Sequence, residues 1–128
     1  MSAEGAVQAA LLAGLRGVPG LNGVYEGPPV KATPPYAEIG ETLSGDWGVK
    51  DRDGRELRLA VTVRDAGETS ARVQALGDAV GAAIAGMPRD LDGWRVASLV
   101  FVRSRLLRPA PGRWGVVIEY RVRVLATA

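Results

Sequence analysis

The run ELRLAVTVRD, residues 56–65, alternates apolar and polar side chains more cleanly than any other part of the chain. Successive side chains of a β-strand point to opposite faces of a sheet, so this alternation predicts a strand with two different faces. The apolar face would carry Leu57, Leu59, Val61 and Val63. The other face carries mostly polar residues, and we expect it to meet water or a polar partner.

Two further long strands are expected near the end of the chain. Residues 114–126, WGVVIEYRVRVLA, alternate again. The side chains expected to point inward are Val116, Ile118, Tyr120, Val122 and Val124. Residues 94–106, WRVASLVFVRSRL, instead have apolar side chains at both parities, which is typical of a central strand covered on two sides. Shorter strands are expected near Val24 and over residues 36–42.

Two segments have helical periodicity. Residues 3–15 place apolar side chains three and four positions apart, with Ser2 as a candidate cap and GVPG as the end. Residues 68–86 form the second expected helix, and Pro88 follows it. Its apolar stripe comprises Val73, Leu76, Val80, Ala83, Ile84 and Met87. We attribute the glycines within this helix to close packing on a sheet.

These elements predict one domain over residues 1–128, since a chain of this length usually builds a single core. The expected class is α+β, with a mainly antiparallel sheet of about four strands and two helices packed on one face. The expected order is α-β-β-β-α-β-β. Residues 27–36, GPPVKATPPY, contain four prolines and cannot form a central strand. We expect an ordered arm or an edge connection there.

The chain contains no cysteine and no histidine. Thiolate nucleophiles, disulfides, His-based acid–base relays and metal sites built from these ligands are therefore excluded. The aspartates at 46, 51 and 53 lie among glycines and cations, where solvated carboxylates are the usual outcome, and they do not fit a calcium loop. No glycine-rich phosphate-binding motif is present. We expect no enzyme activity, no cofactor and no bound metal.

Positive charge is concentrated in residues 93–128, which contain seven arginines and one glutamate, a net charge of +6. Arg103, Arg105, Arg121 and Arg123 recur at every second position on two strands that we expect to be neighbours, so they can form one patch. A face that is solvated or contacts another protein is one interpretation, and a phosphate-facing surface is the other. Neither a DNA-reading helix nor a base-stacking aromatic platform is visible.

The charged stretch GDWGVKDRDG, residues 45–54, surrounds one tryptophan. An aromatic residue isolated among charges often anchors a protein interface. We therefore predict an interface loop here, with Asp46, Trp47, Lys50 and Arg52 as its contact residues. Trp94 and Trp114 lie near strand ends, where we expect them to cap the core.

The order of these weak motifs resembles the tail-completion, or tail-terminator, family of long-tailed bacteriophages and gene transfer agents. The matching segments are GVYEG, PPYAEIGE, GDW, RELRLAVTVRDAGETSARVQALGDAVGAAI and LDGWRVASLVFVRSRLLRPAPGRWGVVIEYRVRV, which together cover nearly the whole chain. One departure lies near Arg64, where relatives often have an aromatic residue.

The resemblance implies a structural subunit that assembles as a ring, typically a hexamer, on the head-proximal end of the tail tube. It implies three kinds of partner: the tail-tube protein, a head-side connector or stopper protein, and DNA passing through the lumen. The expected location is the tail–neck junction of a virion assembled in the host cytoplasm. We expect neither a secretory leader nor a membrane span, since the first residues lack a basic region and the apolar runs are short. Two alternatives stay open, another neck or tail-tube component and a nucleic-acid-binding module using the basic C-terminal third.

Overall fold

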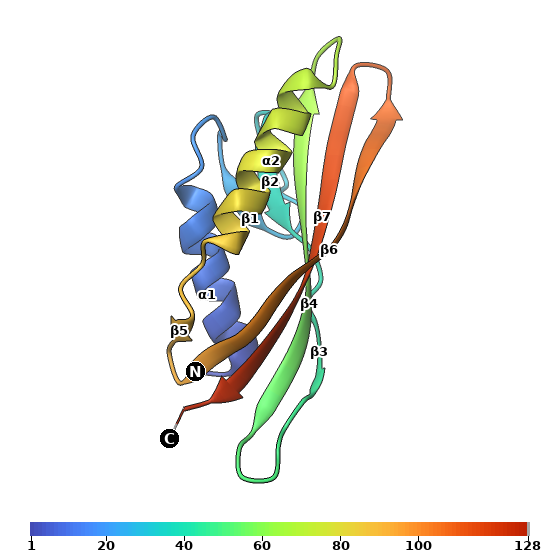
Figure 1. Cartoon of the computed structure of the whole chain (residues 1–128). Coiled ribbons are helices and arrows are strands. Elements are labelled where there is room, and N and C mark those ends of the chain that lie inside the picture. The colour runs from blue at the N-terminus through green and yellow to red at the C-terminus, as the bar shows by residue number, and fades with distance from the viewer. Residues whose placement is uncertain (128) are drawn as a thin grey trace.

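The computed structural model describes residues 1–127, which form one seven-stranded sheet with two helices on one of its faces (Figure 1). In chain order the elements are α1 (Ala3–Arg16), β1 (Val24–Glu26), β2 (Tyr36–Ile39), β3 (Leu43–Asp46), β4 (Gly54–Ala66), α2 (Ala71–Ala85), β5 (Asp90–Leu91), β6 (Trp94–Ala110) and β7 (Arg113–Ala126).

The sheet is built around β4 and β7. Its strand order is β1-β2-β4-β7-β6-β5, and β3 pairs separately with β4. The antiparallel register of β4 and β7 places Leu57 opposite Val122 and Val61 opposite Ile118. These four side chains are buried, which confirms the inward faces predicted from the alternation of both strands.

Both helices cover this apolar face. Helix α1 buries Val7, Leu11 and Leu15, and α2 buries the stripe that includes Val73 and Ile84. The Ser2 hydroxyl accepts a hydrogen bond from the Gly5 amide at 3.0 Å, so the predicted cap is present. Neither helix is long and apolar enough to cross a membrane.

The α+β class is confirmed, but the expected sheet of about four strands in the order α-β-β-β-α-β-β is wrong. The sequence prediction missed β3 and β5, and β1 runs parallel to β2. The missed strands contain four and two residues. Segments this short are held by backbone pairing with a longer neighbour and carry too few side chains to show a period.

The expectation that residues 94–106 form a central, two-sided strand is also wrong. Only Trp94 and Arg95 of β6 pair with β5, so within residues 1–127 the rest of its outer edge has no strand partner. Register shifts interrupt its pairing with β7 at three places. Each bulge changes the face on which later side chains fall, so apolar residues at both parities do not mean burial on both faces.

The proline-rich segment, residues 27–35, connects β1 to β2 without regular structure, as expected. The side-chain amide of Asn22 donates to the carbonyl oxygens of Thr33 and Pro34 at 3.3 and 3.0 Å. The backbone amide of Asn22 also donates to the oxygen of Pro35 at 2.8 Å. These bonds fix the end of the segment where β2 begins.

Candidate assembly surface

The sheet face turned away from the helices, which we call the open face, carries arginines from three adjacent strands. They are Arg58 and Arg64 of β4, Arg121 and Arg123 of β7, and Arg103 and Arg105 of β6. Arg103 lies opposite Glu119 and Arg58 lies opposite Arg121 in the register, so the four arginines predicted as one patch do share a face. The sequence prediction did not assign Arg58 and Arg64 to this site, although it placed both on the polar face of their strand.

Three of these arginines are ion-paired. Arg64 Nε lies 2.6 Å from Glu38 Oε1, and Arg123 Nε lies 3.0 Å from Glu56 Oε2. Arg103 forms a salt bridge with Glu119 through its Nε. The hydrogen bond from Arg103 lowers the pKa of the Glu119 carboxyl. These pairs leave the face only partly neutralised.

The other three, Arg58, Arg105 and Arg121, have no carboxylate within 4.0 Å among residues 1–127. Arg58 and Arg121 face each other across β4 and β7, an arrangement that repels. The Nε atom of Arg121 is also buried without a hydrogen-bond partner in the part of the chain that the structure describes. The open face can therefore still accept an anionic or acidic partner.

The predicted charged loop is the tip of the β3–β4 hairpin, which projects from one end of the molecule (Figure 1). The Trp47 amide donates to Gly54 O at 3.0 Å, and Val49 and Arg52 exchange two backbone hydrogen bonds. Lys50 and Arg52 are exposed on this tip, as is Asp46 at the end of β3. The tip therefore forms a narrow, ordered hairpin end.

Trp47 is half-buried, and the Arg123 guanidinium stacks over its ring, with Cζ 5.3 Å from the ring centre. The structure thus brings Trp47 together with one arginine of the open face. Arg103 and Arg105 lie farther along the sheet, away from Lys50 and Arg52 on the hairpin tip. The eight predicted residues therefore form two groups, which the Trp47–Arg123 contact joins.

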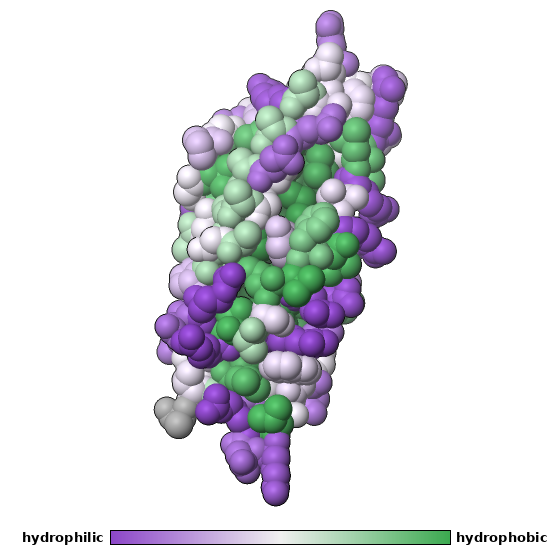
Figure 2. All heavy atoms as spheres, in the orientation of Figure 1, coloured by the Kyte–Doolittle hydropathy of each residue, from purple (hydrophilic) through white to green (hydrophobic). Residues whose placement is uncertain are grey.

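A second surface, which the sequence prediction missed, lies on the helix side between α2 and β6. We call this hollow of about 390 Å³ the apolar groove. Figure 2 shows apolar side chains gathered between the helix and the β6–β7 hairpin, with polar side chains around them. Its walls include Asp78 and Gly81 of α2, Phe101 and Leu106 of β6, and Val116 and Ile118 of β7. The polar side chains of Gln74 and Ser104 also line it. The sequence signal for this surface is the apolar run of β6, whose pattern predicts a central strand covered on two sides.

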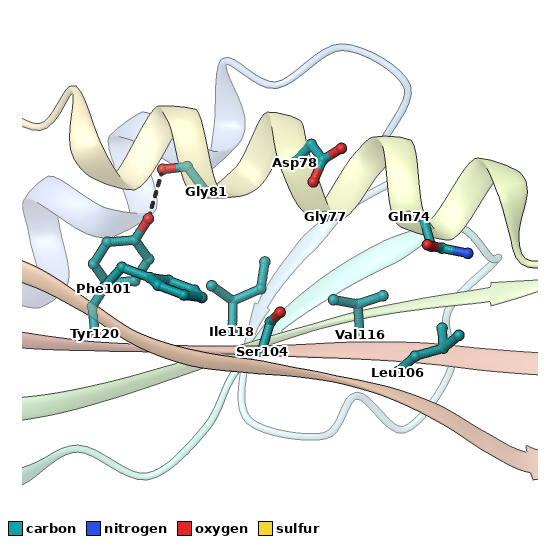
Figure 3. A pocket seen from close by; sticks show the side chains of 10 residues that line it. All are labelled: Gln74, Gly77, Asp78, Gly81, Phe101, Ser104, Leu106, Val116, Ile118 and Tyr120. Carbon is teal, nitrogen blue, oxygen red and sulfur yellow. Dashed lines mark hydrogen bonds between the residues drawn. The ribbon is translucent and has the colours of Figure 1, made fainter.

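Tyr120 closes one end of the groove, where its hydroxyl donates to Gly81 O at 3.2 Å (Figure 3). Phe101 packs edge-on against the Tyr120 ring, with the ring centres 5.6 Å apart. Burial raises the pKa of the Tyr120 hydroxyl, so this hydroxyl stays protonated and keeps its hydrogen bond to Gly81 O to a higher pH than an exposed tyrosine would. The groove thus combines a fixed aromatic pair with open space beside it.

The comparisons with known proteins identify the family. A family model described as tail completion protein gp17 matches residues 5–125. The chain belongs to this family. The resemblance noted in the sequence is therefore confirmed, and this tail completion protein is a structural component of a virion rather than an enzyme.

Two solved structures resemble the tail completion protein. A chain in the virion of a native gene transfer agent particle is 25% identical over 98% of both chains, with a TM-score of 0.83. The bacteriophage SPP1 gp17 protein is 22% identical, covering 94% of this chain and 89% of its own, with a TM-score of 0.62, and shares the fold. A search of proteins with curated functions gave no significant match.

Proposed function

We propose that this tail completion protein closes the head-proximal end of the tail tube as a ring, typically of six copies, stops tube growth and joins the tail to a head-side connector. The observation that carries the proposal is the family match over residues 5–125. The gene transfer agent virion chain, similar over 98% of both chains, supports it.

The geometry suits a subunit that meets several unlike neighbours. The two edges of the sheet differ, with β6 and the apolar groove on one side and β1 with the proline-rich segment on the other. Unlike edges give head-to-tail contacts, which generate a ring when the rotation between copies closes. The open face and the β3–β4 hairpin tip remain available for the tube, the connector or the lumen. Asp46, Trp47, Lys50 and Arg52 are the proposed contact residues on that tip.

Electron microscopy of polymerising tail-tube protein tests this function. With the tail completion protein present, we expect shorter tubes that end in a ring at one end. Tubes of unchanged length without any ring would reject the proposal. The mixture is the decisive sample, because ring assembly can depend on the tube end. Open-ended polymerisation of the protein alone would instead assign it to the tube or another neck position.

A nucleic-acid-binding role is the second candidate, favoured by the three arginines of the open face that have no carboxylate within 4.0 Å among residues 1–127. It predicts DNA binding that weakens steeply with salt. Replacing Arg121 and Arg123 by Ala would then lower the slope of log affinity against log salt by about 1 for each phosphate that the variant no longer binds. Arg16→Ala, on the opposite side of the molecule, is the matched control. No DNA binding at low salt would remove this candidate.

A further inference from the structure

The apolar groove exposes side chains that a soluble subunit usually covers. Phe101 is 54% exposed and Leu106 is 50% exposed, although both point to the helix side of the sheet. Figure 3 shows them beside open space below α2. A hollow that combines exposed aromatic and aliphatic side chains with a few polar groups is a candidate binding surface.

The segment at the opposite edge of the sheet has complementary properties. Residues 27–35, GPPVKATPP, which we call the proline arm, present a fully exposed Val30 followed by an exposed Lys31. Prolines restrict the backbone, and hydrogen bonds hold both ends of the arm, including Gly27 N to Ile39 O at 2.8 Å. An arm that is already ordered loses little conformational entropy when it binds.

The arm cannot fill the groove of its own chain. It joins β1 to β2, whereas β6 forms one wall of the groove, and β4 and β7 lie between β2 and β6 in the sheet. Three strand spacings of about 4.8 Å separate them. Because both ends of the arm are fixed, this arm can reach such a groove only on another copy of the chain.

The chemistry of the two surfaces matches. Proline-rich segments bind in grooves lined by aromatic side chains, and the groove holds the Phe101–Tyr120 pair. Asp78 is the one charged residue in the groove lining within residues 1–127, and Lys31 is the one charged residue of the arm. The arm thus offers an apolar side chain and a positive charge, and the groove offers apolar side chains and a negative charge.

We propose that the proline arm of one copy binds in the apolar groove of the next, with Val30 against Phe101 and Leu106 and Lys31 beside Asp78. The partner is a second copy of this chain. The inference rests on the proposed ring function and adds the contact that builds the ring. Because arm and groove are different surfaces, every copy uses both, and the contact repeats until the ring closes.

Cysteine cross-linking on tail tubes tests the contact directly, because the chain has no cysteine of its own. A chain carrying both Val30→Cys and Ser104→Cys should form a ladder of covalent multimers under mild oxidation. Chains carrying either substitution alone should stop at a dimer or remain uncrosslinked. Ser104 is an exposed residue of the groove, so its replacement leaves the core intact.

Disruptive variants supply a second readout. Val30→Asp and Phe101→Asp should each weaken assembly on tube ends about tenfold or more, since each prevents burial of an apolar side chain. Mixed together without tubes at high concentration, the two variants should form pairs and no rings, because one intact arm meets one intact groove. Lys31→Glu and Asp78→Lys should each weaken assembly about two- to fivefold, and the double variant should recover it.

The outcomes separate this inference from the proposed function. If wild-type protein caps tubes, but the double-cysteine chain gives no ladder and Val30→Asp caps tubes normally, the arm-in-groove contact is wrong and the ring function stands. If wild-type protein never caps tubes, the proposed function fails and this inference fails with it. Circular dichroism of each variant shows whether it is folded.

Discussion

Arg72 donates two hydrogen bonds to the Asp65 carboxylate, from Nε to Oδ2 at 2.8 Å and from Nη2 to Oδ1 at 2.6 Å. Asp65 is only 4% exposed, and its Oδ1 also accepts from the Ala66 amide at 2.8 Å. The pair spans the turn between the end of β4 and the first residues of α2. It therefore fixes where α2 starts over the sheet, a helix whose N-cap residue Ser70 makes no capping bond of its own.

Acid should weaken the fold partly through Asp65. The hydrogen bond from Arg72 lowers the pKa of this carboxyl, against the opposing effect of burial. Because this pKa is lower in the folded chain than the unfolded value of about 3.9, the ionised Asp65 carboxylate stabilises the fold above about pH 3.9. This stabilisation is lost as the pH falls through the folded-state pKa. Asp65→Asn should lower the free energy of unfolding at pH 7 by about 2 kcal/mol and flatten its decline in acid.

Urea denaturation at pH 7 and pH 3 measures both effects. Asp92→Asn, in the exposed turn between β5 and β6, is the control and should behave like wild type. Equal acid sensitivity of wild type and Asp65→Asn would show that the pair contributes nothing to the pH dependence.

Two glycines of α2 should respond differently to alanine. A Cβ at Gly77 would meet Val116 Cγ1 at 3.1 Å, whereas a Cβ at Gly81 would come no closer than 3.6 Å to the Tyr120 hydroxyl. Alanine in a helix gains up to about 1 kcal/mol over glycine. Gly81→Ala should keep that gain, and Gly77→Ala should lose it to crowding. Thermal melting of the two variants decides, and a more stable Gly77→Ala would contradict the expected crowding.

Trp47→Ala should leave the subunit folded but impair ring closure or attachment. The tryptophan is half-buried outside the core, so removing its stacking with Arg123 should cost about 0.5–1 kcal/mol of stability. Tube capping by Trp47→Ala is compared with capping by Trp47→Phe, which retains a ring. An unfolded Trp47→Ala protein would instead assign this residue to the core.

Tyr120→Phe should remove one hydrogen bond and one group that ionises at alkaline pH. Loss of the bond to Gly81 O should lower the free energy of unfolding by about 1 kcal/mol. Burial raises the pKa of Tyr120 above the unfolded value of about 10. The protonated hydroxyl therefore contributes its full stabilisation below about pH 10, and this stabilisation is lost as the pH rises through the folded-state pKa. Denaturation at alkaline pH should therefore show a smaller decline for Tyr120→Phe than for wild type, and an identical decline would exclude this role.

The sequence predicted those elements whose faces differ in polarity. Apolar and polar side chains alternate along β4 and β7 because one side of each strand packs on the helices and the other meets solvent. The two-residue period of the sequence therefore matches the observed burial. The caps of α1 and the apolar stripe of α2 are likewise local properties. The same period of two predicts the arginine patch, because β6 and β7 are neighbouring strands.

The missed features depend on tertiary structure. In β6 the bulges move later side chains to the other face of the sheet, so odd and even positions no longer correspond to one face each. The sequence therefore predicts burial for a strand that is largely exposed. The groove exists because α2 covers β4 and β7 but leaves the helix side of β6 open. The stacking of Arg123 on Trp47 joins residues from opposite halves of the chain, and no local pattern encodes such a contact.

The central position of β7 has a consequence for biosynthesis. This strand pairs with β4 on one side and β6 on the other, yet it follows all other strands in the sequence. Until residues as far as Ala126 have left the ribosome, β4 lacks its main partner and β6 has no central strand on which to pair. The sheet therefore cannot be completed before β7 has been synthesised, and until then the paired edges of β4 and β6 lack the strand that joins them.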